Sequence, residues 1–210
     1  MLKIYPMPVG VAQANCYILS LENQAIVVDP GDEAVKIITY LETKKLKPAA
    51  ILLTHGHFDH IGALEVVQSK YNIPVYVHQE EKEYLTNPDY NLSQKAGRTP
   101  IEIKDLSAYH FIASHGEMEL LGQIIEVRHV PGHSLGSIAF HFKEEGVVLV
   151  GDALFKGSIG RTDLIGGNHE QLITSVETQL FTLPDTTIVY SGHGLATTIH
   201  DEKRTNPFFR

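Results

Sequence analysis

The stretch AAILLTHGHFDHIG, residues 49–62, decides how the rest of the chain is interpreted. Its apolar run, residues 49–53, follows a proline and is typical of a short strand buried on both faces. Four side chains of metal-ligand type come directly after it: His55, His57, Asp59 and His60. From residue 61 the apolar residues recur at helical spacing. Because an open α/β sheet leaves a crevice at the carboxyl ends of its strands, we expect chemistry at this turn.

The spacing of these side chains indicates metal binding. His55 and His57 lie two positions apart in an extended turn, so both imidazoles can converge on one ion, while Asp59 and His60 face a neighbouring position. Imidazole and carboxylate suit zinc, iron or manganese. The alternative is that polar residues simply end a strand. Three histidines and an aspartate within six residues make that the weaker interpretation.

The H-x-H-x-D-H pattern resembles the signature of the metallo-β-lactamase superfamily, whose members are mostly metal-dependent hydrolases. That family has three further ligands downstream in a fixed order. The chain carries His133 in VPGHSLGS, Asp152 in VLVGDALF and His193 in IVYSGHG, each after an apolar run. The resemblance implies an α/β fold, a four-layer αββα sandwich, in a single domain over residues 1–210. Its two pseudo-symmetric halves are expected at about residues 1–106 and 107–210.

The resemblance also implies a set of ligands for two divalent metal ions, zinc first, with iron or manganese as alternatives. It assigns His55, His57 and His133 to one ion, and Asp59, His60 and His193 to the other. Asp152 would bridge both ions, and a bridging water would become a hydroxide that attacks a carbonyl. We expect Asp59 to take up the proton of that water. The implied reaction is hydrolysis of an ester, thioester or amide.

Residues 151–167, GDALFKGSIGRTDLIGG, resemble the corresponding segment of type II glyoxalases, the hydroxyacylglutathione hydrolases, particularly their short bacterial form. In that family a basic residue nine positions after the bridging aspartate contacts the thiol part of the substrate, and Arg161 has this spacing. The alternative is a surface arginine paired with Asp163. The chain ends 17 residues after His193, so we expect no C-terminal helical substrate domain, and another thiol carrier could replace glutathione.

Composition narrows the choice of partners. The chain has 210 residues, 43% of them hydrophobic, and a net charge of −8, which disfavours a nucleic-acid surface. The single cysteine, Cys16, is expected to be a buried structural thiol. We find no signal peptide and no apolar run of transmembrane length, and we predict a cytoplasmic protein with a small-molecule thioester substrate and no membrane partner. For the oligomeric state, both a monomer and a dimer agree with the sequence.

Two other functions fit parts of the pattern. Persulfide dioxygenases share the fold, the H-x-H-x-D-H motif and a similar GRTD segment. The resemblance to them implies a single iron held by His55, His133 and Asp152, with coordination positions left for oxygen. A metal-stabilised scaffold is the third hypothesis, although a structural site is usually closed. The number of bound metals and oxygen uptake would separate the hydrolase from the dioxygenase.

The remaining pattern predicts alternating strands and helices. Strands are expected at residues 2–5, 15–20, 24–28, 74–78, 117–121, 123–130, 137–142, 147–150 and 186–190, and helices at 33–45, 63–71, 79–85 and 168–181. Asp29 ends one of these strands ahead of a Pro-Gly turn. It could orient a ligand histidine, but turn formation is the commoner role for an aspartate at this position.

Overall fold

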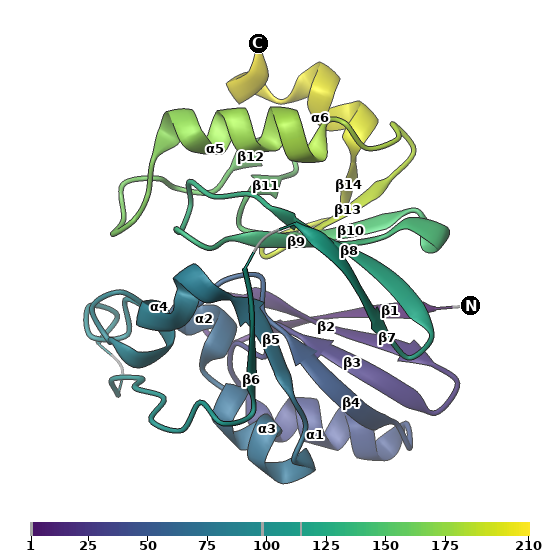
Figure 1. The fold of residues 1–210 in the computed structure, drawn as a ribbon, viewed down its shortest axis with the longest axis vertical. Coiled ribbons are helices and arrows are strands. Elements are labelled where there is room, and N and C mark those ends of the chain that lie inside the picture. Colours follow the sequence, from purple (N-terminus) through teal and green to yellow (C-terminus); the bar gives the residue numbers. More distant parts are fainter. Residues whose placement is uncertain (1, 98, 114) are drawn as a thin grey trace. The chain divides into compact units, whose positions relative to one another are not determined.

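The computed structural model describes residues 2–97, 99–113 and 115–210. The chain divides into two compact units, residues 1–112 and 113–210, and each contains one six-stranded sheet (Figure 1). The expectation of a single domain stays a prediction. Among the described residues, no helix is both long and apolar enough to cross a membrane.

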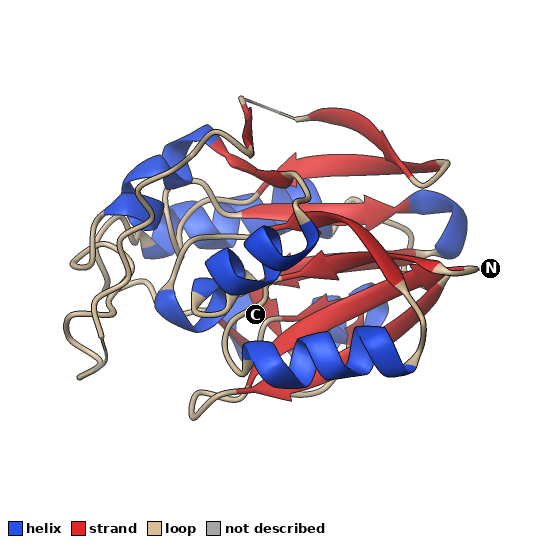
Figure 2. Cartoon of the chain, turned by 90° about the horizontal axis from the view of Figure 1, so that it is seen from below, coloured by secondary structure: helices blue, strands red, loops and turns tan. Residues whose placement is uncertain are grey.

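The sheet of the first unit combines an antiparallel and a parallel half. Its strands lie in sequence order: β1 (Lys3–Val9), β2 (Ala14–Leu21), β3 (Gln24–Val28), β4 (Lys47–Leu52), β5 (Val75–His78) and β6 (Tyr109–Ile112). β1 to β3 pair antiparallel through short turns, whereas β3 to β6 pair parallel because longer connections carry the chain back. The strands are the red arrows of Figure 2.

Two helices cover one face of this sheet, α1 (Ala34–Thr43) and α3 (Leu64–Tyr71), as Figure 1 shows. Ile37 and Leu41 of α1, and Leu64 and Val67 of α3, are buried three or four residues apart, the spacing of one helix face. They join the strand residues in one apolar core. The shorter helices α2 (Phe58–Ile61), η1 (Gln79–Glu81) and α4 (Lys82–Thr86) lie beyond the carboxyl ends of β4 and β5.

The second unit is built mainly from antiparallel strands. Its sheet has the order β14 (Thr197–Thr198), β13 (Ile188–Ser191), β10 (Val147–Gly151), β9 (Ile138–Phe142), β8 (Gln123–His129) and β7 (Gly116–Leu120), with β10 and β13 parallel. A separate hairpin pairs β11 (Leu154–Phe155) with β12 (Ser158–Ile159). The short helix η2 (Lys143–Glu145) connects β9 to β10.

Helix α5 (His169–Ser175) and the π-helical segment η3 (Val176–Leu180) pack on this sheet through Leu172, Val176 and Leu180. Helix α6 (Ile199–Thr205) follows β14 and is followed by η4 (Pro207–Phe209). Asn168 caps α5 and Thr198 caps α6, each accepting a hydrogen bond from a backbone N–H in the first turn.

Most of the expected elements are present, with shifted ends. The helix expected at 33–45 begins at Ala34, because Glu33 has a left-handed backbone with φ of 51°. The expected helix at 168–181 is α5 continued by η3. The short strands β6, β11, β12 and β14 and helix α6 were not predicted. Elements of two to seven residues carry too little periodicity to stand out in a sequence.

Candidate metal centre

The predicted ligands of the first unit lie in the turn between β4 and α2. His55, His57 and His60 are buried, and Asp59 is half-buried in the first turn of α2. The ring of His55 lies 4.8 Å from that of His57 and 4.2 Å from that of His60, centre to centre. The fold therefore brings these three imidazoles together inside one unit.

Asp29, at the end of β3, organises this turn. Its Oδ1 accepts the backbone N–H of Thr54 at 2.8 Å, and its Oδ2 accepts the Thr54 hydroxyl at 2.6 Å. The same Oδ2 lies 3.0 Å from Nδ1 of His60. A ligand atom from each of Asp29, His55 and His60 lies within 4.8 Å of the others. Asp29 thus contacts the predicted ligand His60 as well as the turn backbone, although turn formation is the commoner role of an aspartate at this position.

These contacts determine which nitrogen of each ring carries the proton. The single hydroxyl proton of Thr54 goes to Asp29, so Thr54 Oγ1 must accept from Nδ1–H of His55, 3.1 Å away. Nδ1–H of His60 likewise donates to the Asp29 carboxylate. In both rings Nε2 is then the nitrogen with the lone pair, as metal binding requires.

The backbone between His55 and His57 is held from the side by η1 and α4. Gly56 N–H donates to the buried Glu81 carboxylate at 2.7 Å. A Cβ on Gly56 would lie 2.6 Å from Cβ of Tyr84, so no side chain fits there. The ring of His57 meets that of Tyr84 edge-on at 5.6 Å. Only glycine lets the chain pass this close to α4 between two histidines.

The predicted ligands of the second unit surround one carboxylate oxygen. Oδ2 of Asp152 lies 3.6 Å from Nε2 of His133 and 3.5 Å from Nε2 of His193. Both separations are too long for hydrogen bonds between these atoms. Two ligands about 2.1 Å from a tetrahedral ion lie about 3.4 Å apart. The three side chains, which come after β8, β10 and β13, therefore have the spacing of metal ligands.

His133 has the same proton arrangement as His55 and His60. Its Nδ1–H donates to the backbone carbonyl of Arg161 at 2.8 Å, which leaves the lone pair on Nε2. Gly160 makes this approach possible, since a Cβ there would lie 1.9 Å from the carbonyl oxygen of Asp152 and 3.0 Å from Nδ1 of His133. The segment after β12 is thus in close contact with two predicted ligands.

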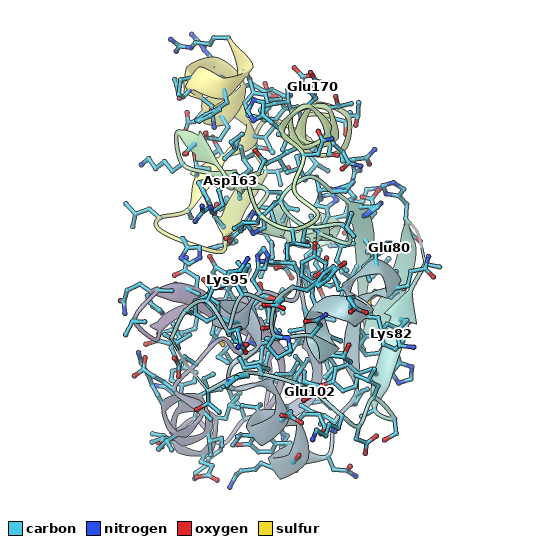
Figure 3. The ribbon with its side chains drawn as sticks, turned by 90° about the vertical axis from the view of Figure 1, so that its left-hand side faces the viewer. Glu80, Lys82, Lys95, Glu102, Asp163 and Glu170 are labelled. Atoms are coloured by element: carbon cyan, nitrogen blue, oxygen red, sulfur yellow. The ribbon has the colours of Figure 1, made fainter. Side chains whose placement is uncertain are left out.

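The Arg161 side chain forms the ion pair that was the alternative to substrate binding. Its Nε and Nη2 donate to the two carboxylate oxygens of Asp163 at 2.7 and 2.8 Å. Asp163 is labelled in Figure 3, on the loop that follows β12. Hydrogen bonding to Arg161 lowers the Asp163 pKa to about 2, and the same pair raises the pKa of Arg161. Both side chains are exposed, and substrate binding by Arg161 stays a prediction.

Each metal set implied by the resemblance combines ligands from both units, and these sets stay a prediction. Within each unit, the predicted residues do lie together. The sequence did not point to Thr54, Glu81 or the Arg161 carbonyl. Thr54 is adjacent to His55, but Glu81 contacts a residue 25 positions away, and no local pattern signals such a contact. Cys16 is buried as expected, and burial raises the pKa of its thiol, which makes it unreactive.

The chain belongs to the metallo-β-lactamase superfamily, whose sequence model matches residues 9–193. It is 48% identical over 202 residues to the probable metallo-hydrolase YqgX of Bacillus subtilis (strain 168), over 96% of this chain and 95% of the relative. It is 36% identical over 212 residues to the hydroxyacylglutathione hydrolase GloC of Haemophilus influenzae, an alignment that covers 99% of this chain and 98% of the relative. Family and donor set together make the chain a metallo-hydrolase of this superfamily.

Solved structures confirm the predicted α/β fold of the metallo-β-lactamase type. BLEG-1, described as a B3 metallo-β-lactamase, matches with a TM-score of 0.95 and 41% identity over 99% of both chains. TTHA1623 in a di-iron-bound form matches with a TM-score of 0.86 and 37% sequence identity, over 97% of this chain and 99% of that one. ETHE1 from Myxococcus xanthus matches with a TM-score of 0.76 and 27% sequence identity, over 98% of this chain and 83% of that one.

Proposed function

We propose that this chain is a metal-dependent hydrolase that cleaves a thioester such as S-D-lactoylglutathione. The observation that carries the proposal is the position of Asp152 Oδ2, close to Nε2 of both His133 and His193. A carboxylate oxygen at ligand spacing from two imidazole nitrogens is suited to binding metal, and we propose that two cations share it. The proposal uses the ligand sets described above, with Asp152 common to both.

The divalent ions, when bound, would lower the pKa of a water molecule and polarise the substrate carbonyl. The chain's own residues orient the ligands. Asp29, Thr54 and the Arg161 carbonyl hold Nδ1–H of three histidines, so that each presents Nε2. Asp59 accepts the proton that leaves the water. Water adds to the thioester carbon, the C–S bond breaks, and the thiolate leaves to take up a proton.

Two features support a thioester as substrate. The relative GloC, named a hydroxyacylglutathione hydrolase, matches over nearly its whole length. The GRTD segment places Arg161 on an exposed loop next to His133, where its guanidinium can exchange Asp163 for a substrate carboxylate. We propose zinc as the bound metal, with iron as the alternative because the similar structure TTHA1623 is in a di-iron-bound form. We propose a cytoplasmic enzyme acting on a small molecule, without nucleic acid or membrane partners.

A persulfide dioxygenase is the second candidate. It is favoured by the match to ETHE1 from Myxococcus xanthus, which is less similar in sequence than the structures above. In this alternative His55, His133 and Asp152 would hold a single iron. The orientation of His60 by Asp29 argues for a second occupied position, because a histidine outside the metal set would not need its tautomer determined by a buried carboxylate.

The decisive experiment is thiol release from S-D-lactoylglutathione by metal-loaded protein, with Asp152→Ala as the control. We expect release that depends on the metal and falls by at least about a thousandfold in the variant. Two metal equivalents per chain would accompany it. No release, together with one iron per chain and oxygen consumption with glutathione persulfide, would favour the dioxygenase. Thioesters of other thiols and a β-lactam complete the panel. Activity that survives full metal removal would refute both enzymes.

A further inference from the structure

The hairpin β11–β12 connects two parts of the candidate metal centre. It leaves the sheet directly after Asp152 and returns at Gly160 and Arg161. At its base, the returning segment contacts the Asp152 backbone and supplies the carbonyl that accepts Nδ1–H of His133. The Ser191 hydroxyl also donates to Leu154 O at 2.6 Å. The position of this hairpin therefore controls the surroundings of two predicted ligands.

A buried carboxylate on α6 holds the tip of this hairpin. Oε2 of Glu202 accepts the backbone N–H of Gly157 at 2.9 Å and the Asn206 amide at 2.8 Å, and Oε1 accepts the Thr197 hydroxyl at 2.6 Å. The Asn206 amide also donates to Ser158 O at 3.0 Å. Glu202 is only 1% exposed. One side chain thus connects α6, the start of β14 and the hairpin tip.

A carboxylate is a costly way to attach a helix. Its burial is unfavourable unless hydrogen bonds satisfy it, and apolar side chains would attach α6 equally well. What a carboxylate adds is direction, because several donors converge on two oxygens whose positions are defined. A hairpin with two residues per strand has little stability of its own. Its position must come from such contacts.

We propose that Glu202 is a positioning residue for the metal centre, acting through the β11–β12 hairpin. It holds Gly157 directly and Ser158 through the Asn206 amide. The hairpin transmits this position to Gly160 and Arg161, which contact Asp152 and His133. The inference rests on the proposed metal-dependent function. It predicts that a side chain on helix α6, which is not itself a predicted ligand, sets the metal affinity of the protein.

The test measures zinc affinity by chelator competition in the full-length protein, with thermal unfolding of the metal-free form as the measure of stability. Glu202→Ala removes all three hydrogen bonds, whereas Glu202→Gln keeps an oxygen for the Gly157 N–H. The matched control is Lys203→Met on the same helix. It breaks the 2.6 Å ion pair between Lys203 and Asp185, which does not involve the hairpin.

We expect Glu202→Ala to weaken zinc binding at least about tenfold, the size seen when a partner of a metal ligand is lost. Glu202→Gln should stay within about threefold, because the hydrogen bond remains and only its charge assistance is lost. Lys203→Met should leave the affinity unchanged. Unchanged affinity in Glu202→Ala, or an equal loss in Lys203→Met, would overturn the inference while the proposed function stands.

Should Glu202→Ala fail to fold, Asn206→Ser replaces it. Serine can still accept the Phe208 N–H that Asn206 accepts at 3.1 Å, but it is too short to reach Ser158. Weaker zinc binding in Asn206→Ser supports the inference, and wild-type affinity overturns it. A wild-type chain that binds no divalent metal would overturn the proposed function together with this inference.

Discussion

Oδ2 of Asp29 lies 3.0 Å from Nδ1 of His60, and both side chains are buried. The same oxygen accepts the Thr54 hydroxyl, which in turn accepts from His55. One carboxylate therefore orients two of the predicted ligands of the first unit, one directly and one through a threonine. Their lone pairs are arranged before any metal arrives, which reduces the entropy lost on binding.

Replacing Asp29 by Asn tests this relationship. Asparagine tolerates the left-handed backbone of Asp29, φ 49°, and retains one oxygen, but its NH2 group cannot accept from His60 Nδ1–H. We expect metal affinity to fall about tenfold to a hundredfold with a small change in stability. Chelator competition and thermal unfolding measure the two effects. Wild-type affinity in Asp29→Asn would mean that the carboxylate serves the turn alone.

Arg161 and Asp163 can be separated by paired variants. If Arg161 binds the substrate, Arg161→Ala should raise KM about tenfold with kcat nearly unchanged. The reason is that the lost contact would stabilise the bound substrate and the transition state equally. Asp163→Ala removes the partner of the exposed pair and should leave KM equal or lower it. Steady-state kinetics of both variants give the answer. An exposed ion pair contributes little to stability, so a fall in unfolding temperature with unchanged KM would favour a structural role.

Metal removal should lower the unfolding temperature. A ligand that binds only the folded state stabilises it by about 2.7 kcal/mol at one hundred times its dissociation constant. For a chain of this length that corresponds to a shift of roughly 5–10 °C. We expect a chelator to cause this loss and added zinc to reverse it, as followed by calorimetry. The Asp152→Ala protein is the control, in which the shift should largely disappear.

His115 should give the second unit a small pH dependence. Its Nδ1 accepts the backbone N–H of His129 at 3.1 Å, so the folded chain favours the neutral ring, and burial followed by the neighbouring His129 lowers its pKa. The unfolded chain then binds more protons. This stability is present above the unfolded pKa of about 6.5 and is lost as the pH falls through the folded value.

Because His115 is largely exposed, solvent screening keeps this effect on stability small. The measurement is urea unfolding of wild type and His115→Asn between pH 8 and pH 5. The variant should lose less stability on acidification than the wild type. Parallel curves would show that the ring does not titrate differently on folding.

The sequence by itself located the predicted ligand residues of the first turn. His55, His57, Asp59 and His60 follow a strand and precede a helix in one short segment, and turn formation of this kind depends on neighbours in the chain. The same local logic located the strands that end near His133, Asp152 and His193. Local pattern was therefore enough to indicate the family, the fold class and the type of chemistry.

Only the tertiary structure decided what surrounds those ligands. Asp29 reaches His60 across 31 positions and Glu202 reaches Gly157 across 45. Both contacts exist because elements distant in the chain come together, and neither leaves a periodic signal. The same holds for Arg161, whose backbone carbonyl, rather than the side chain that drew attention in the sequence, contacts His133. Residue types are local information, whereas the direction of a lone pair depends on contacts that only the folded chain provides.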